Sequence, residues 1–546
     1  MEEGKSVLPH RCPQDIRHLY VPVHEIADKV HTVRETFKTQ KTFPLSFRKE
    51  QLRRLYYVLE DHADEFVDAM YHDMGKPRKD ALMELTSCLN EICHTVENME
   101  HWLADQEVKS DLNFCMASTR IKRKPLGVAL IMTSFNAPLS GAVWPLSSAI
   151  AGGNCFVLKP AEGSPGVAAL WTKYLYENLD KSFHTVVNGE IPETTELLNQ
   201  KFDQISCTGS ATVGRIVATA AAKHLTPCVL ELGGKNPVLI DRDVDLDDAA
   251  KKIAWARTMF GGQTCLCPER DATDYILVHP DQTTELIAKV EHHWSQFWSQ
   301  PLINDPKYGR VVHKRAYERI TSLLGPSRIP AEASEADLFL PPMILRVERD
   351  DPLMSQEIFG PIVCVLECSS IEDAISFVNS GDRPLAVYPF SKNSKWVETV
   401  LQKTLAGTAT VNDLMLSGGP AGFEFGGVGE SGYGKLKGRA GLYSFTSAMT
   451  IVETPKWMGY LTGVRFPNAT PFDDWLASLG KPKPKFSRKV GSADKVGKNR
   501  TGIVSNATPL TWAVAMLVVA AALHKDGGIR EIGRWACMIS KAVPDL

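Results

Sequence analysis

The sequence predicts an α/β protein built from two doubly wound parallel sheets, and three observations support this class. Short apolar runs without polar alternation recur along the chain, as expected for strands buried on both faces of a parallel sheet. Segments with helical spacing separate these runs, which gives the strand–helix–strand order of a doubly wound fold. At 546 residues, the chain is too long for one compact domain and suits two or three.

The composition is that of an ordinary globular protein, and it argues against nucleic acid and metal as partners. Hydrophobic residues make up 44% and charged residues 23% of the chain, and a formal net charge of −3 offers nucleic acid no basic surface. The 12 cysteines show neither zinc-site spacing nor a disulfide framework, which favours a reducing, intracellular compartment. The acidic N-terminus lacks the apolar core of a secretory signal.

The N-terminal part of the chain is expected to be mostly helical. Residues 1–24 are polar and are expected to be loose. From residue 25 to about 106, apolar residues such as Leu52 and Leu55 recur at helix spacing between charged side chains. This pattern predicts a helical layer whose role is packing.

The first strand–helix–strand unit spans residues 128–158. Residues 128–132 and 155–158 are apolar runs, and residues 145–151 between them predict a helix. The second run leads into Lys159 and Glu162. Because parallel sheets bind ligands at the carboxyl ends of their strands, these two residues are candidates for cofactor contacts, with a solvated loop as the alternative.

A second candidate ligand site lies where a strand over residues 205–209 turns into an Ala-rich helix. Gly209 marks the turn, and Ser210 and Gly214 follow in the first turns of the helix. A helix N-terminus offers free N–H groups and a positive dipole end to a pyrophosphate. Residues 427–432 fit the G-x-G-x-x-G spacing but follow no strand, so we reject them as the dinucleotide site.

The stretch that organises the chain lies between residues 229 and 268. Glu231 stands beside the glycine pair 233–234, and after an expected helix over residues 243–260, Cys265 follows a second glycine pair. Paired glycines let a ligand approach the backbone closely. A thiol attacks carbonyl carbons and a carboxylate moves protons, so the pair predicts covalent catalysis. The alternative is a buried cysteine and a helix-capping glutamate.

These motifs resemble those of the aldehyde dehydrogenase superfamily over roughly residues 26–454. The likeness rests on Glu-Leu-Gly-Gly-Lys at 231–235 and Gly-Gln-Thr-Cys at 262–265. Residues 186–194 and 383–386 resemble class 3 and its fungal fatty-aldehyde or apocarotenal relatives. The resemblance implies two Rossmann-like domains, one for the cofactor and one for catalysis, a bridging element used for oligomerisation, a C-terminal tail and a homodimer.

The likeness also implies a division of the chain. Residues 25–228, which include the helical layer, correspond to the cofactor domain, and residues 229–425 correspond to the catalytic domain. Residues 426–460 return to the cofactor domain as the bridging element. Residues 461–546 form a basic tail with an apolar helix.

The reaction implied by the resemblance is oxidation of an aldehyde to a carboxylic acid. Cys265 would add to the carbonyl, Asn136 would stabilise the resulting oxyanion, and Glu231 would activate the water that hydrolyses the thioester. Cys267 is a rival nucleophile, but the Gln-Thr-Cys match places the role on Cys265.

The resemblance assigns the cofactor contacts as well. Seven residues carry them: Lys159 and Glu162 at the adenosine ribose; Gly209, Ser210 and Gly214 at the pyrophosphate; Glu357 at the nicotinamide ribose; and Phe359 at the nicotinamide. A carboxylate that accepts both ribose hydroxyls repels a 2′-phosphate, which favours NAD over NADP. The family accepts either cofactor, so NADP stays open.

The C-terminal tail has the pattern of a membrane-binding segment. Residues 481–500 carry eight Lys or Arg against one acid, and residues 510–523 carry no charge. A basic stretch beside an apolar helix suits an anionic membrane surface on the cytoplasmic side. This apolar run is shorter than the roughly 20 residues that span a bilayer. The alternative is a helix packed on the enzyme's own surface or on a partner subunit.

Two departures from the family pattern lie near the expected site. Residues 269–273 are an insertion after the cysteine, which either bulges outward or misplaces the thiol. Ala137 replaces the usual aromatic residue after Asn136, which is expected to widen the aldehyde tunnel. A second hypothesis is therefore a catalytically impaired family member that binds a nucleotide or a protein partner.

Overall fold

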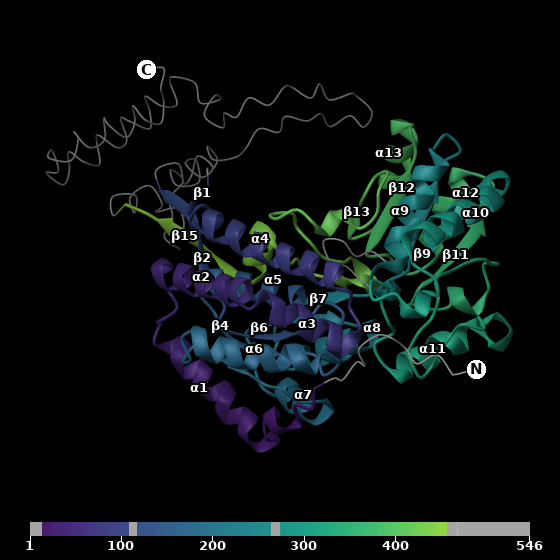
Figure 1. The fold of residues 1–546 in the computed structure, drawn as a ribbon. Coiled ribbons are helices and arrows are strands. Elements are labelled where there is room, and N and C mark those ends of the chain that lie inside the picture. The colour runs from purple at the N-terminus through teal and green to yellow at the C-terminus, as the bar shows by residue number, and fades with distance from the viewer. Residues whose placement is uncertain (1–13, 109–116, 264–272, 456–466, 468–546) are drawn as a thin grey trace, which may run out of the picture. The chain divides into compact units, whose positions relative to one another are not determined.

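The computed structural model describes residues 14–108, 117–263 and 273–455, together with residue 467. The chain divides into a main unit, residues 1–104 and 123–447, and a second unit, residues 105–122 and 448–546. Figure 1 labels the helices and strands. The expected α/β class is confirmed, because two mainly parallel sheets alternate with helices along the main unit.

The N-terminal helical layer is confirmed. It consists of α1 (Ile26–Lys38), α2 (Leu45–Asp61), α3 (Ala63–Met74) and α4 (Arg78–Leu103). Helix α2 buries Leu52 and Leu55 on one face, as the helical spacing predicted. The layer also buries charged side chains: Arg48 on α2, Asp73 on α3, and Asp80, Glu84 and Glu91 on α4. The residue pattern did not predict buried charges in this layer.

The first sheet has the strand order β14-β7-β6-β3-β4-β5. Its strands are β3 (Val128–Met132), β4 (Cys155–Lys159), β5 (His184–Val186), β6 (Gln204–Gly209), β7 (Cys228–Leu232) and β14 (Gly432–Tyr433). All neighbours pair parallel except β14 and β7. Strands β3 and β4 are buried along their whole length, which explains their lack of polar alternation.

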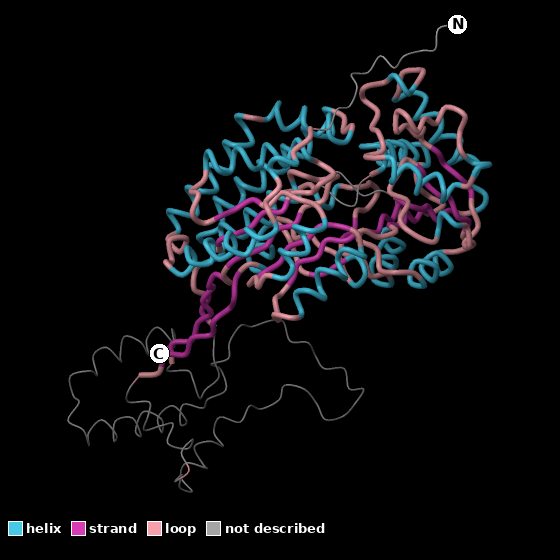
Figure 2. The backbone as a smooth tube through the Cα atoms, turned by 90° about the horizontal axis from the view of Figure 1, so that it is seen from below, coloured by secondary structure: helices cyan, strands magenta, loops and turns pink. Residues whose placement is uncertain are grey.

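Four helices connect the parallel strands of the first sheet. They are α5 (Ser140–Gly152), α6 (Pro165–Asn178), α7 (Ile191–Asn199) and α8 (Ala211–Ala222). The chain moves one way along the sheet through α5 and α6, and the other way through α8. Because parallel crossovers are right-handed, α8 covers the face opposite to α5 and α6. Figure 2 shows the strands of the main unit running between helices.

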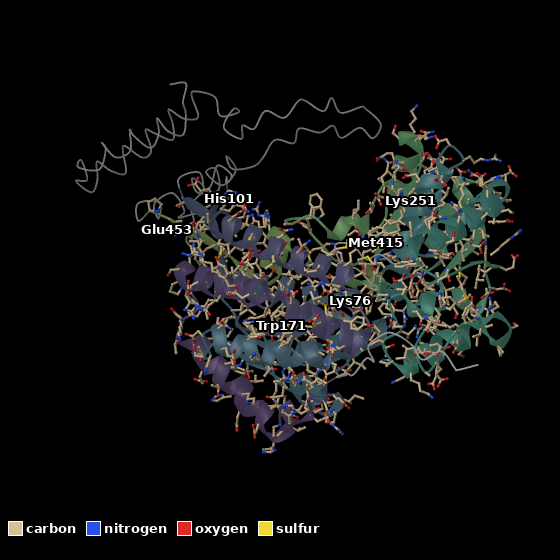
Figure 3. The ribbon with its side chains drawn as sticks, in the orientation of Figure 1. Lys76, His101, Trp171, Lys251, Met415 and Glu453 are labelled. Carbon is tan, nitrogen blue, oxygen red and sulfur yellow. The ribbon has the colours of Figure 1, made fainter. Side chains whose placement is uncertain are left out.

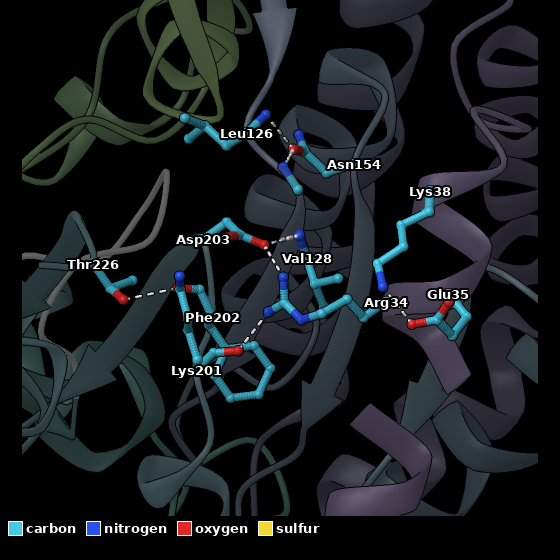
Figure 4. A network of polar contacts seen from close by, with 11 residues as sticks. Arg34, Glu35, Lys38, Leu126, Val128, Asn154, Lys201, Phe202, Asp203 and Thr226 are labelled. Carbon is cyan, nitrogen blue, oxygen red and sulfur yellow. Dashed lines mark hydrogen bonds and ion pairs between the residues drawn. The ribbon is translucent and has the colours of Figure 1, made fainter. Parts of the chain in front are cut away.

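A polar network ties α1 to the start of β3 (Figure 4). Asp203, which precedes β6, accepts a hydrogen bond from the backbone N–H of Val128 at 2.9 Å and pairs with Arg34 of α1 at 2.7 Å. Asn154 accepts from the two backbone N–H groups that precede Val128. These bonds fix where β3 begins, and therefore where the loop at its other end lies.

The second sheet has the order β10-β11-β9-β8-β12-β13, with all pairs parallel. Its strands are β8 (Asn236–Ile240), β9 (Thr273–Val278), β10 (Met343–Arg346), β11 (Ile362–Glu367), β12 (Ala386–Phe390) and β13 (Thr408–Ala409). Its helices are α9 (Leu246–Thr258), α10 (Pro280–Phe297), α11 (Lys314–Leu324), α12 (Ile371–Ser380) and α13 (Ser394–Lys403). The short helix α14 (Gly438–Ser444) follows β14. The chain changes sheets between β7 and β8, at residues 233–235. The domain limits expected from the sequence stay predictions.

The second unit contains most of a three-stranded sheet in the order β1-β2-β15. Its strands are β1 (Gln106–Glu107), β2 (Ser118–Pro125) and β15 (Thr446–Glu453), and β1 pairs antiparallel with β2. Arg120 pairs with Asp105 at 3.2 Å and with Glu453 at 2.7 Å. The tail over residues 461–546 lies, apart from Pro467, outside the described residues. Among the helices that are described, none combines the length and the hydropathy needed to cross a bilayer.

Candidate active site

The carboxyl ends of the parallel strands bring most of the predicted site residues to one edge of the first sheet. The register pairs Met132 with Lys159 and Thr208 with Glu231. The loop that carries Asn136 follows β3 directly, and β6 ends at the predicted turn residue Gly209. Chain segments far apart in sequence therefore converge where doubly wound sheets bind their ligands.

Glu231 is a buried carboxylate without a hydrogen-bond partner. It lies in β7 with 5% of its surface exposed, and neither of its oxygens has a partner among the described residues. Burial raises the pKa of Glu231 to about 8, although the positive charge of Lys435 opposes the shift. The helix-cap alternative is wrong, because Glu231 lies within a strand. A carboxyl group that titrates near neutral pH suits general base chemistry.

A small cavity of about 20 Å³ lies against Glu231, which is room for about one water molecule. Its lining is otherwise mainly apolar, with Ala137, Trp144, Leu385 and Phe425 among the wall residues. Ala137 therefore lies in the wall that faces the predicted base, where a larger aromatic side chain would occupy more of the space.

The glycine-rich loop that follows Phe425 packs against the same carboxylate. A Cβ added to Gly426 would lie 2.8 Å from Glu231 Oε1. Within the loop, Gly429–Ser431 forms a single 3₁₀ turn before β14, so the strand–turn–helix context of a dinucleotide fingerprint is missing. Of the glycines in the spacing, Gly427 packs on the Ser431 backbone and Gly432 on the Leu230 carbonyl, so they bring the loop close to itself and to β7.

Asn136 is 1% exposed in the loop between β3 and α5. Three side chains from outside the loop hold its backbone: Lys76, Glu84 and Trp171. The indole N–H of Trp171 donates to the carbonyl of Pro138 at 3.1 Å. Figure 3 labels Lys76 and Trp171. Lys76 and Glu84 were not predicted from the sequence. The one signal for them is a row of charges at helix spacing in a layer expected to pack.

The predicted adenosine-ribose pair is present at the end of β4. Lys159 is 3% exposed, and its Nζ donates to the Pro160 carbonyl at 2.8 Å and lies 3.5 Å from Glu162. Burial lowers the pKa of Lys159, and the charge of Glu162 opposes that shift. The solvated-loop alternative is wrong for Lys159, whereas the Glu162 side chain is 61% exposed. Donor and acceptor are thus both available to a diol.

The predicted pyrophosphate site is the N-terminus of α8. The Ser210 hydroxyl accepts from the backbone N–H of Val213 at 3.3 Å and caps the helix. A Cβ on Gly214 would lie 2.6 Å from the methyl carbons of Leu232, so this glycine lets α8 approach β7 closely. The helix start lies directly after Gly209, at the carboxyl edge of the sheet.

Glu357 lies against the glycine pair of the Glu231 motif. A Cβ on Gly233 would lie 2.1 Å from Glu357 Oε2, so any larger residue there would displace the Glu357 carboxylate. Burial and the charge of Asp274 raise the pKa of Glu357. Arg319 donates to the carbonyls of Glu357 and Ile358 at 3.1 and 2.6 Å, which holds the backbone of this loop.

Phe359 approaches the Asn136 loop from the second sheet. Its backbone has a φ of 49°, a left-handed conformation that is uncommon for a bulky residue. Its ring centroid lies 5.9 Å from that of Phe135, at an interplanar angle of 74°. Phe135 directly precedes Asn136, the predicted oxyanion donor. The Phe359 ring, which is predicted to pack against the nicotinamide, therefore lies against the residue next to that donor.

The predicted nucleophile Cys265, its rival Cys267 and residues 264–272 lie outside the described residues. The chain enters this segment through Gln263, which is fully buried. The Gln263 amide donates to the Arg310 carbonyl at 2.6 Å, so the approach to the segment is anchored.

An ionic cluster anchors the chain just after residues 264–272. Asp274 of β9 is 1% exposed and pairs with Arg257 at 3.4 Å and with Lys235 at 3.7 Å. Lys235 also donates to the carbonyl of Leu353 at 3.0 Å. Over the described ranges, no group of His, Cys, Asp and Glu side chains is arranged to hold a metal ion.

The fold and the site together define an α/β protein with two doubly wound sheets and a buried carboxyl group near the carboxyl edge of the first one. The model of the aldehyde dehydrogenase family matches residues 21–451, so the chain belongs to that family.

Individual relatives agree with this assignment. Aldehyde dehydrogenase family 3 member A2 of Mus musculus is 38% identical over 421 residues, which cover 76% of this chain and 85% of the relative. The dimeric NADP-preferring aldehyde dehydrogenase of Canis lupus familiaris is 35% identical over 435 residues, 79% of this chain and 95% of the relative. A substrate-bound Staphylococcus aureus AldH structure superposes with a TM-score of 0.79 at 31% identity, over 84% of this chain and 99% of that one. The expected likeness to class 3 is confirmed.

Proposed function

We propose that this protein oxidises long or apolar aldehydes, such as fatty aldehydes or apocarotenals, to carboxylic acids with NAD+ through a covalent thioester on Cys265. The observation that carries the proposal is Glu231, a buried carboxyl group without a hydrogen-bond partner among the described residues, beside a cavity with room for about one water. An unpaired buried carboxyl group is costly, so its presence needs a chemical role.

The proposed chemistry divides among three side chains. The Cys265 thiolate attacks the aldehyde carbon, and Asn136 stabilises the oxyanion that forms. A nicotinamide cofactor, when bound, accepts the hydride that leaves this carbon. Glu231 then removes a proton from the water that attacks the thioester, which releases the acid and restores the thiol. A raised pKa of about 8 makes Glu231 a stronger base than an exposed glutamate.

The chain's own residues fit the cofactor. Lys159 and Glu162 would bind the adenosine ribose, the α8 N-terminus at Gly209, Ser210 and Gly214 would bind the pyrophosphate, and Glu357 would bind the nicotinamide ribose, with Phe359 against the nicotinamide. The exposed Glu162 carboxylate favours NAD over NADP. The canine relative is named NADP-preferring, so both cofactors need to be compared.

The preference for apolar substrates rests on two observations. The cavity beside Glu231 has an apolar lining in which Ala137 is small, and the sequence resembles fatty-aldehyde and apocarotenal enzymes. We also propose that the protein is a homodimer, since the name of the canine relative calls that enzyme dimeric, and that residues 481–523 bind an anionic membrane. Vesicle flotation of the full chain and of a chain ending near residue 460 tests the membrane contact.

The activity test compares the wild-type protein with Cys265→Ser. We expect reduction of NAD by decanal for the wild type and none for the variant. A panel of aldehydes of rising length, each with NAD and with NADP, then identifies the substrate class. Equal traces for wild type and variant would contradict the proposed function and favour a nucleotide-binding role without catalysis.

A further inference from the structure

Three charged side chains at the start of α4 form a row that faces into the main unit. Lys76, Asp80 and Glu84 are four residues apart, so they lie on one side of the helix and of the turn that precedes it. Their exposures are 0%, 9% and 2%. The next exposed lysine, Lys79, is on the solvent side of the same turn. If these three residues formed a solvated charged face, their side chains would be exposed instead of buried.

Glu84 caps a helix other than its own. Its Oε1 accepts from the backbone N–H groups of Leu139 and Ser140 at 3.0 and 2.9 Å and from the Ser140 hydroxyl at 3.0 Å. Helix α5 begins here, and its N-cap residue Leu139 makes no side-chain cap hydrogen bond. Glu84 therefore supplies the cap and fixes the end of the Asn136 loop.

Lys76 connects that cap to the loop itself. Its Nζ forms a buried ion pair with Glu84 Oε2 and donates to the backbone carbonyl of Asn136 at 3.2 Å. The same ammonium lies 5.4 Å from the centre of the Phe260 ring. One buried cation thus contacts both the oxyanion loop and the turn at Phe260.

Asp80 holds the turn at Phe260. Its Oδ2 accepts from the Phe260 backbone N–H at 2.8 Å. Phe260 has φ 46° and ψ 38°, and Gly261 follows with φ 59°. A left-handed conformation is unfavourable for a non-glycine residue, so surrounding contacts must maintain it. The bond to Asp80 is one such contact.

Stability does not account for this row. Replacing a buried ion pair with well-packed apolar side chains is often neutral or stabilising, so buried charges are a poor way to strengthen a helical layer. These charged side chains instead hold particular parts of the backbone in place, because each one is bonded to a specific backbone atom of one of two loops.

We propose that Lys76, Asp80 and Glu84 are positioning residues that fix the Asn136 loop and the Phe260 turn relative to each other for aldehyde oxidation. This inference rests on the proposed function, since it matters for turnover only if Asn136 stabilises the oxyanion. A displacement of about 1 Å at a reacting group lowers rates about 100-fold. Loss of a positioning bond therefore lowers kcat and leaves cofactor affinity intact.

The test uses a disruptive substitution at each acidic position and a conservative one at Asp80, all in the full-length enzyme. Asp80→Leu and Glu84→Leu remove the acceptor oxygens, and we expect kcat with decanal to fall 10- to 100-fold while the Kd for NAD stays within twofold. Asp80→Asn keeps an oxygen that accepts the Phe260 bond, and we expect it to recover most of the lost kcat. Lys79→Met is the matched surface control.

Asp73 offers a second comparison from the same segment. Its two carboxylate oxygens accept from the backbone N–H groups of Gly166 and Val167 at 2.9 Å and hold the start of α6, which follows the Lys159 loop. Asp73→Leu is therefore expected to weaken NAD binding more than it lowers kcat. An equal loss of kcat and of NAD affinity in the Asp73, Asp80 and Glu84 variants would indicate general loosening of the layer and overturn the proposal.

Amide hydrogen exchange separates this proposal from the proposed function. Exchange at Phe260 should accelerate at least tenfold in Asp80→Leu, and exchange at Leu139 and Ser140 should accelerate likewise in Glu84→Leu. If the wild type oxidises no aldehyde, the proposed function fails, and the exchange data still decide whether the row fixes both loops. Unchanged exchange at these amides overturns the positioning role whatever the activity.

Discussion

Two buried glutamates in the main unit, Glu231 on β7 and Glu84 on α4, show how differently the fold treats the same side chain. Glu84 is 2% exposed, pairs with Lys76 and accepts three hydrogen bonds from the start of α5. Glu231 is 5% exposed, and its two oxygens have no partner among the described residues.

The difference teaches that burial alone does not identify a reacting group. A carboxylate with filled acceptor sites has no capacity left to take a proton from water, so it holds structure in place. A carboxylate with open acceptor sites is destabilising, and the fold retains it where its basicity is used. Each of the following predictions tests one side of this contrast.

The largest expected effect concerns Glu231→Gln. Loss of the base should lower steady-state kcat with decanal by about 100- to 10,000-fold, because the thioester can no longer be hydrolysed efficiently. The first turnover does not need this base, so a burst of cofactor reduction should persist. Stopped-flow measurement of cofactor absorbance checks this, with Cys265→Ser as the control that should show no burst. A variant that turns over like the wild type would remove Glu231 from the mechanism.

Lys76→Met should produce the largest loss of stability. It leaves Glu84 buried without its cationic partner, and removal of one member of a buried pair costs about 3–5 kcal/mol. Urea unfolding followed by tryptophan fluorescence measures the difference. Lys79→Met, on the exposed side of the same turn, should change the free energy of unfolding by less than about 0.5 kcal/mol. Similar losses in both variants would contradict the assignment of the buried pair.

Lys76→Met lowers the stability, whereas Glu231→Gln should raise it, and the gain should appear only at high pH. The folded pKa of Glu231, about 8, lies above its unfolded value of 4.5, so the folded state holds a proton that the unfolded state loses. The wild type therefore loses stability as pH rises from about 4.5 to about 8, by roughly a few kcal/mol, whereas the glutamine variant does not.

Thermal unfolding of both proteins across this pH range tests the sign. The melting temperatures should agree near pH 5, and the variant should be the more stable of the two near pH 9. Parallel curves would mean that Glu231 is ionised over the whole range.

The smallest expected effect is at the exposed end of the cofactor pair. Glu162→Gln removes a negative charge that is 61% exposed, and exposed charges contribute about 0.2–1 kcal/mol. The ratio of kcat/KM for NADP to that for NAD should therefore rise about two- to fivefold. An unchanged ratio would indicate that Glu162 does not face the 2′ position.

Much of the main unit could be predicted from the sequence, because the local residue pattern there matches the burial of each element in the fold. The runs at β3 and β4 are apolar because both faces of each strand are buried. Gly209 ends β6, at the point where the chain turns from a strand into a helix. Glu231 was predictable as a candidate because the motif around it is long. That its oxygens have no partner among the described residues was not predictable, since this depends on what segments far apart in the sequence place around them.

The row on α4 could not be predicted for a related reason. Lys76, Asp80 and Glu84 lie among many other charged residues at helical spacing. This spacing shows that the three residues share one face, but it does not show whether that face is buried or exposed. Only the position of α5 and of the Phe260 turn shows that this face is the buried one.

The cap that Glu84 places on α5 has a practical consequence for enzyme engineering. Anyone who transplants the loop between β3 and α5 from another family member into this scaffold would exchange residues 133–140. Such a chimera would still receive its cap from Glu84 and its carbonyl contact from Lys76, so the donor loop must accept both. Swapping residues 73–84 together with the loop would carry the matching supports across, and makes a better unit of exchange.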